Sequence, residues 1–144
     1  VLAHMYPDAA VPVAQLSTDA TKPASYHFDL GTKLSALRDS GVLVLASGNV
    51  VHNLAVVDPS RGETGTDWAR RFDDHAQELL TERPEDALTL IEHPDVRLAV
   101  PTADHFLPVL YSAGIAAGAG EKLEAFTKDY LWGSLSMTSY RSAA

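Results

Sequence analysis

The stretch Gly41-Val42-Leu43-Val44-Leu45-Ala46 decides the fold class of this 144-residue chain. Valine and leucine follow one another here without alternating polar residues, which is typical of a strand buried on both faces of a parallel sheet. The glycine in front of the run suits the left-handed position that follows the end of a helix. The sequence therefore predicts a helix that ends at Gly41 and a central strand over residues 42–46.

The residues before this run complete the pattern. Val11-Pro12-Val13-Ala14-Gln15-Leu16 predicts a strand, because turn-forming residues flank it on both sides. Pro23 suits the first turn of a helix. Apolar residues then recur at near-helical spacing at Phe28, Leu30, Leu34 and Leu37. Strand, helix and strand in this order predict a right-handed βαβ unit. We expect an α/β fold, a layered sheet with helices on both faces.

The rest of the chain predicts further helices and two closing strands. A second amphipathic helix is expected from Trp68 to Leu79, with Thr66 as its N-cap. A short helix is expected over residues 84–91, and another that begins near His105 or Phe106. Residues 114–120 are expected to form a loop rich in alanine and glycine. Residues 122–130 and 134–140 predict two strands, and no linker divides the chain into two domains.

Charge and composition exclude several classes of function. The chain has 11 basic and 19 acidic residues, a formal net charge of −8, which disfavours nucleic acids and anionic membranes as partners. No apolar run approaches the ~20 residues of a membrane span. The absence of cysteine excludes thiolate metal sites and a cysteine nucleophile. A small-molecule substrate or a protein partner remains.

Two of the six histidines are candidate functional residues. His52 lies just beyond the carboxyl end of the predicted strand 42–46, where ligands bind in open parallel sheets. His105 follows a second apolar stretch at the start of a helix. Each also has an ordinary alternative, namely a loop histidine bonded to a carbonyl and a helix-start histidine packed on Phe106. Two imidazoles alone are too few for a stable metal site. His27, His75 and His93 are expected to be surface or capping residues.

Five motifs occur in order along the whole chain. They are His4-Met5-Tyr6-Pro7-Asp8-Ala9, Pro12-Val13-Ala14-Gln15-Leu16-Ser17, Ser47-Gly48-Asn49-Val50-Val51-His52-Asn53-Leu54, Pro101-Thr102-Ala103-Asp104-His105-Phe106-Leu107-Pro108-Val109-Leu110 and Gly133-Ser134-Leu135-Ser136-Met137. Together they resemble the class III extradiol ring-cleavage dioxygenases of the LigB type, and within them the 4,5-DOPA dioxygenase group.

The resemblance implies that residues 1–144 are the C-terminal portion of a single catalytic domain. Members of that group have a further segment, with two metal-binding histidines, before the position that matches Val1. It further implies that His52 is the acid/base residue, at a position that is also counted as a metal ligand in the 4,5-DOPA group, and that His105 is a metal ligand. His4 is given no catalytic role, because the group varies at this position. On this basis, we expect the isolated portion to be inactive.

The implied chemistry is O₂-dependent ring opening of a catechol such as DOPA at a non-haem metal, Fe(II), a site that Zn(II) can occupy in a purified protein. A cytoplasmic protein is expected, whereas the oligomeric state is not predicted. The alternatives are a non-enzymatic binding or signalling relative with the same fold, and an inert fragment that lacks two ligands. The presence of both His52 and His105 favours the enzyme.

Overall fold

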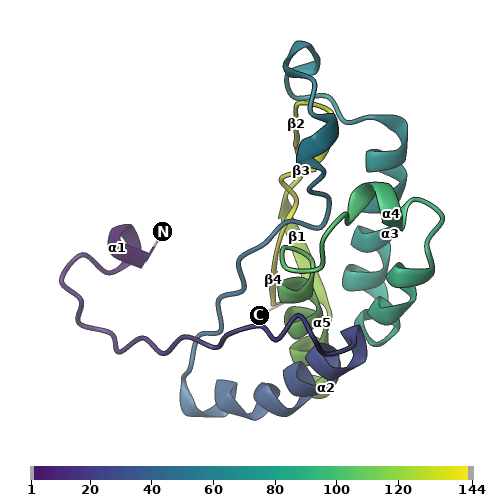
Figure 1. Ribbon diagram of the computed structural model, residues 1–144. Helices are drawn as coiled ribbons and strands as arrows, with labels where there is room; N and C mark the ends of the chain where they lie inside the picture. Colours follow the sequence, from purple (N-terminus) through teal and green to yellow (C-terminus); the bar gives the residue numbers. More distant parts are fainter. Residues whose placement is uncertain (1, 143–144) are drawn as a thin grey trace.

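Three longer helices form the body of the molecule in the computed structural model, which describes residues 2–142 (Figure 1). They are α2 (Ala24–Leu34), α3 (Asp67–Glu82) and α5 (Leu107–Ala119). Shorter helical segments connect them or lie at the ends: α1 (Leu2–Met5), α4 (Val96–Ala99) and the 3₁₀ turns η1 (Ser35–Ser40), η2 (Leu54–Val56), η3 (Pro59–Arg61) and η4 (Pro84–Glu92). Within residues 2–142, no helix combines the length and the apolar character needed to cross a bilayer.

Two small antiparallel sheets are built from the last part of the chain. Strand β1 (Leu123–Thr127) pairs with β4 (Ser139–Ser142), and β2 (Tyr130–Leu131) pairs with β3 (Leu135–Ser136). The two predicted closing strands are therefore present, but each is divided in two. Helices and sheets occur together in one unit, as the predicted α/β class requires.

The amphipathic pattern of α3 determines the core. Phe72, Ala76 and Leu79 are buried, as their helical spacing predicts, and Thr66 is the N-cap residue. The Thr66 hydroxyl does not cap the helix, because it donates instead to the carbonyl of Gly133. The buried face of α3 packs against η4 and, through the shared core, against α5. Helix α3 also contacts β1, which joins the helices to the sheet.

Helices α2 and α5 pack with their backbones in close contact. A Cβ atom at Gly114 would lie 2.2 Å from the carbonyl oxygen of Phe28, and one at Gly31 would lie 2.5 Å from that of Tyr111. The prediction of a loop over residues 114–120 is wrong, because Gly114 serves close helix packing and α5 continues to Ala119. The prediction of a surface or capping role for His27 is also wrong: its ring is fully buried here and bonds to the Tyr111 hydroxyl at 2.9 Å.

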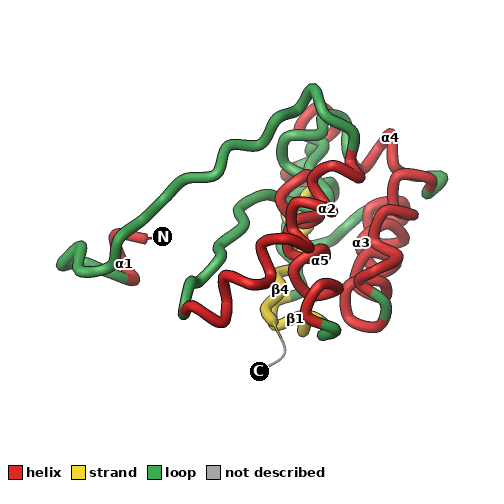
Figure 2. The backbone as a smooth tube through the Cα atoms, turned by 90° about the horizontal axis from the view of Figure 1, so that it is seen from below, coloured by secondary structure: helices red, strands yellow, loops and turns green. Residues whose placement is uncertain are grey.

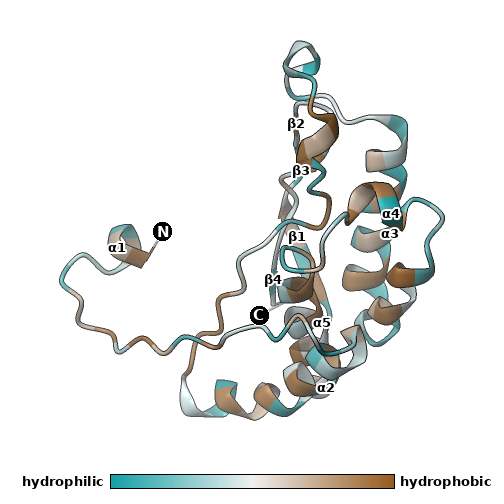
Figure 3. Cartoon of the chain, in the orientation of Figure 1, coloured by the Kyte–Doolittle hydropathy of each residue, from teal (hydrophilic) through white to brown (hydrophobic). Residues whose placement is uncertain are grey.

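The two strands of the predicted βαβ unit are present only as extended segments. Residues 11–16 and 42–46 flank α2 and η1 as predicted, but neither belongs to a strand ladder in the described part of the chain. A strand needs a hydrogen-bonded neighbour, and no segment within residues 2–142 lies beside them in that way. Val13 and Leu43 are therefore about two-thirds exposed, at 66% and 64%. Figure 3 shows hydrophobic stretches along both segments.

An N-terminal arm extends away from this body. The arm comprises residues 2–22 and carries α1 near its end, and the views in Figures 1 and 2 agree that it lies apart from the helices. Nearly all of its residues are exposed. The arm therefore adds nothing to the core in this structure.

Candidate functional site

His52 is held in a buried loop between the helices and the β2–β3 hairpin. It follows Val50 and Val51, whose side chains belong to the core, and is itself only 6% exposed. Its backbone N–H donates to the carbonyl of Ala99 at 2.9 Å, and its backbone pairs with Leu135. The main chain therefore fixes the position of this histidine from two sides.

The imidazole of His52 lies between two carbonyl groups. Nδ1 is 3.1 Å from the oxygen of Asn49, and Nε2 is 2.9 Å from the oxygen of Thr102. A neutral imidazole can donate to only one of them, whereas the protonated ring donates to both. Burial nevertheless lowers the pKa of His52 below its ordinary value, and the two carbonyls offset only part of that effect. The ring is therefore neutral near pH 7, with acceptors in place for an added proton.

His105 lies beside His52 although 53 positions separate them in the sequence. The centroids of the two rings are 5.1 Å apart, with an angle of 37° between their planes. Gly48 permits this approach, because a Cβ atom there would lie 2.2 Å from the His105 carbonyl oxygen. Asn49 then donates its N–H to the same oxygen at 2.9 Å. His105 lies in the turn before α5, and its side chain is half exposed.

Asp104 adds a carboxylate at the same place. One of its oxygens is 3.5 Å from Nε2 of His105. The Thr102 side chain donates a hydrogen bond that lowers the pKa of Asp104, with smaller contributions from His105 and His52 in the same direction. The sequence analysis did not select Asp104 as a site residue. The signal that could have identified it is its position next to the candidate His105.

The β2–β3 hairpin holds the loop of His52 from the other side. The amide side chain of Asn49 donates to the carbonyl of Ser136 at 2.7 Å, and the N–H of Ser136 donates to Val51 at 3.0 Å. Asn53 and Ser134 exchange a further pair of hydrogen bonds. These positions appear in the sequence motifs, but nothing in their residue types predicted that the two segments touch.

The described residues do not by themselves form a metal centre. Among residues 2–142 there is no group of three or more His, Asp or Glu side chains placed to hold an ion. Both ring nitrogens of His52 already face carbonyl oxygens, which makes this residue a poor ligand in the geometry observed. His105 has the more accessible ring of the two candidates. His4 belongs to α1, on the arm that lies apart from the helices (Figure 1).

Comparison with known proteins places this arrangement in context. Residues 2–140 match the family model described as the catalytic LigB subunit of aromatic ring-opening dioxygenase. The chain is 42% identical to a 4,5-DOPA dioxygenase extradiol of Escherichia coli K12, over 96% of this chain and 52% of that protein. It is 33% identical to a protein of the same name from Beta vulgaris, over 95% of this chain and 51% of that one.

A solved structure shows the same fold. The crystal structure of an uncharacterised protein from Escherichia coli K12 matches with a TM-score of 0.86 at 40% identity, over 96% of this chain and 58% of the other. The predicted α/β fold class is thereby confirmed. The chain spans about half the length of the curated relatives it matches. Because the family model covers nearly all of its residues, this chain belongs to the family of the catalytic LigB subunit of aromatic ring-opening dioxygenases.

Proposed function

We propose that this chain is the C-terminal portion of the catalytic domain of an extradiol dioxygenase that opens the ring of a catechol such as DOPA. The observation that carries the proposal is the contact of His52 and His105, whose ring centroids lie 5.1 Å apart. Two curated relatives that match almost the whole chain are named 4,5-DOPA dioxygenase extradiol, which supports the same reaction class.

His52 is the acid/base residue in this proposal. A catechol loses a proton when it binds through both oxygens, so the site needs a base that is neutral at the working pH. The lowered pKa of His52 keeps the ring neutral. To take a proton from a catechol, the ring has to turn one nitrogen away from the carbonyl of Asn49 or Thr102, while the other carbonyl still accepts the opposite N–H. The same ring can later return that proton to the opened product.

His105 is the metal ligand in this proposal, because its ring is exposed while both nitrogens of His52 are occupied. The expected metal is Fe(II), with O₂ as co-substrate. The described residues lack a three-ligand set, so the other ligands are proposed to come from polypeptide outside this chain. The two-histidine arrangement is then only part of the active site.

Metal binding by the chain alone tests this division of the site. We expect an anaerobic Fe(II) titration of the 144-residue chain to show weak binding or none, since stable sites commonly use three or more protein ligands. Saturable binding of one ion below micromolar concentration would contradict the proposal that ligands are missing. A His105→Ala variant, titrated in parallel, distinguishes binding at this site from binding elsewhere.

Activity tests the two roles separately. In an active dioxygenase that contains this chain, His52→Gln is expected to retain the metal and to lower kcat roughly 10²-fold or more, the usual contribution of a general acid/base. His105→Ala is expected to lose the metal as well as the activity. Metal content and catechol consumption measured on the same samples check both expectations. Normal turnover by His52→Gln would show that the acid/base assignment is wrong.

A further inference from the structure

Asp73 is a fully buried carboxylate on α3. Within the described part of the chain no ion pair involves it, and the nearby cations Arg70 and Lys128 bind Asp67 and Asp74 instead. Removing a carboxylate from water without a cation is costly unless hydrogen bonds replace the lost solvent. Those bonds therefore indicate what Asp73 holds in place.

All the side-chain donors to Asp73 come from one segment, residues 130–138. Ser136 and Thr138 donate their hydroxyl groups at 2.5 and 2.7 Å, and Tyr130 donates its phenol at 3.1 Å. Tyr130 belongs to β2, and Ser136 belongs to β3. The carboxylate of α3 thus binds both strands of the β2–β3 hairpin. Hydrogen bonds to a charged acceptor are about twice as strong as neutral ones.

Ser136 connects this carboxylate to the loop of His52. Its hydroxyl bonds to Asp73, while its N–H and carbonyl bond to Val51 and to the side chain of Asn49. Val51 immediately precedes His52, and the carbonyl of Asn49 faces Nδ1 of the His52 ring. Ser136 is 1% exposed, so water does not compete for these bonds. One residue therefore joins α3 to two positions in the segment that immediately precedes His52.

We propose that Asp73 is a positioning residue that fixes the orientation of His52 through Ser136. The functional importance of Asp73 rests on the acid/base role proposed for His52. The hydrogen bonds that run from Asp73 through Ser136 to the His52 loop are a property of the folded chain and do not depend on that role. The carboxylate holds Ser136 from the side of α3, and Ser136 holds the side chain of Asn49 and the carbonyl of Val51 in the segment that leads into the candidate base. Loss of either member should loosen the loop without removing any group from the site.

The test uses hydrogen exchange and NMR on the 144-residue chain. Ser136→Ala removes the link, and Asp73→Asn removes the charge that accepts three hydroxyls. In both variants we expect the amides at positions 136 and 53 to exchange about tenfold faster, as loss of a hydrogen bond to a charged group implies. The ring signals of His52, recorded near pH 8 where the imidazole is neutral, are expected to shift in both.

Tyr130→Phe and Thr138→Val are the matched controls. Each removes one hydroxyl donor to Asp73 but leaves its bond to Ser136 in place, so both should lower the unfolding midpoint without moving the His52 ring signals. Unchanged exchange and ring signals in Ser136→Ala would overturn the proposal, as would equal shifts in the two controls. If Asp73→Asn does not fold, Ser136→Ala and the two controls still test the proposal. None of these measurements depends on ring-cleavage activity, so failure of the proposed function would be seen separately.

Discussion

At His52, the hydrogen bonds that hold the residue are all made to backbone atoms. Carbonyl oxygens face both ring nitrogens, and a hydrogen bond to Ala99 fixes the main chain. Such contacts place the ring without adding another charge, so burial remains the main influence on its pKa. The chemistry of this residue therefore depends on how well the surrounding backbone is held.

Gly48 is the most sensitive backbone position beside the site. In Gly48→Ala the new methyl group would meet the His105 carbonyl at 2.2 Å, so residues 48 and 105 must separate. The hydrogen bond from Asn49 to the same carbonyl would then be lost. We expect the free energy of unfolding to fall by about 2 kcal/mol or more, measured by denaturant titration.

Gly41→Asn is the control for that experiment. Gly41 also has a special backbone, with φ of +73°, but nothing lies within 4 Å of the position of its Cβ. Asparagine tolerates this left-handed conformation, so only a small loss of stability is expected. Equal losses in both variants would show that close approach to His105 is not what requires Gly48.

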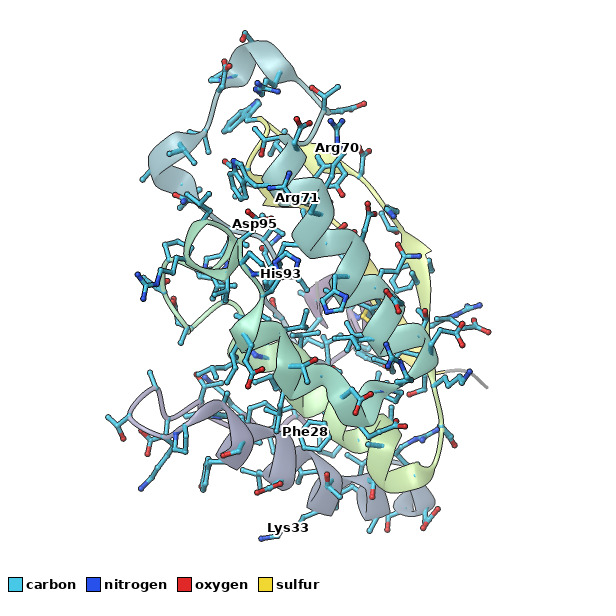
Figure 4. All side chains as sticks on the ribbon, turned by 90° about the vertical axis from the view of Figure 1, so that its right-hand side faces the viewer. Phe28, Lys33, Arg70, Arg71, His93 and Asp95 are labelled. Carbon is cyan, nitrogen blue, oxygen red and sulfur yellow. The ribbon has the colours of Figure 1, made fainter. Side chains whose placement is uncertain are left out.

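His93 makes the stability of the chain depend on pH. Its ring packs edge-on against Phe72, with centroids 5.2 Å apart. Figure 4 shows it near the ion pair of Arg71 and Asp95. Burial lowers the pKa of His93. The carboxylate of Asp95 opposes this effect, whereas His75 and Arg71 add to it. As pH falls below the ordinary value of about 6.5, the unfolded chain takes up this proton first, so the free energy of unfolding decreases.

His93→Asn is expected to reduce that dependence. Asparagine does not titrate, and its side-chain oxygen can accept the N–H of Asp95, which bonds to Nδ1 of His93 in the structure. Unfolding midpoints measured near pH 7.5 and pH 5.5 should differ less in this variant than in the unmodified chain. The same fall in both proteins would assign the pH dependence to other groups.

Not every functional residue could be found from its type and neighbours. His52 stood out because it follows an apolar run, whereas Asp73 is followed by Asp74 and His75, which together resemble an exposed charged face. The helical spacing could have shown that Asp73 is buried, because it lies one turn from Ala69 and Ala76 on the buried face of α3. Its hydroxyl partners, however, lie more than 50 residues away and could not be predicted.

At the scale of elements, the predictions succeeded where an element depends on its own residues. Helix α3 shows its apolar stripe in sequence, and its bounds follow from Thr66 and the residues around Pro84. The length of helix α5 was underestimated, because the glycines and alanines of residues 114–120 indicate a loop when the packing against α2 is unknown. Residues 11–16 and 42–46 have the composition of strands, but a strand forms only beside another segment.

The glycines of α5 provide a test of this packing. In Gly114→Ala the added methyl group would lie 2.2 Å from the Phe28 carbonyl and 2.9 Å from the N–H nitrogen of Thr32, which are rigid backbone atoms. We expect a loss of about 3 kcal/mol in unfolding free energy, at the upper end for overpacking. Ala119→Gly, at the exposed end of the same helix, should cost about 1 kcal/mol or less. Similar losses would contradict a specific backbone contact between α2 and α5.

At the scale of the whole molecule, net charge and exposed apolar surface act in opposite directions. The formal charge of −8 makes copies of the chain repel one another. The extended residues 42–46 present apolar side chains and have no ladder partner within residues 2–142. Unpaired extended segments of this kind are templates for association with other chains. The balance between the two depends on salt, because ions screen charge but not apolar contact.

This balance predicts that the chain self-associates through residues 42–46, and more strongly as salt is added. Leu43 and Leu45 point to the same side of an extended segment and are 64% and 53% exposed. Replacing both with lysine should reduce association, while changing the unfolding free energy by no more than about 0.5 kcal/mol, as is usual at exposed sites. Sedimentation velocity at low and high salt measures the first effect, and denaturant titration the second. Ile91→Lys, at a residue of similar exposure (49%) outside this segment, should leave association unchanged. If it reduces association as much as the double variant, general surface charge rather than the segment 42–46 controls the behaviour of the whole molecule.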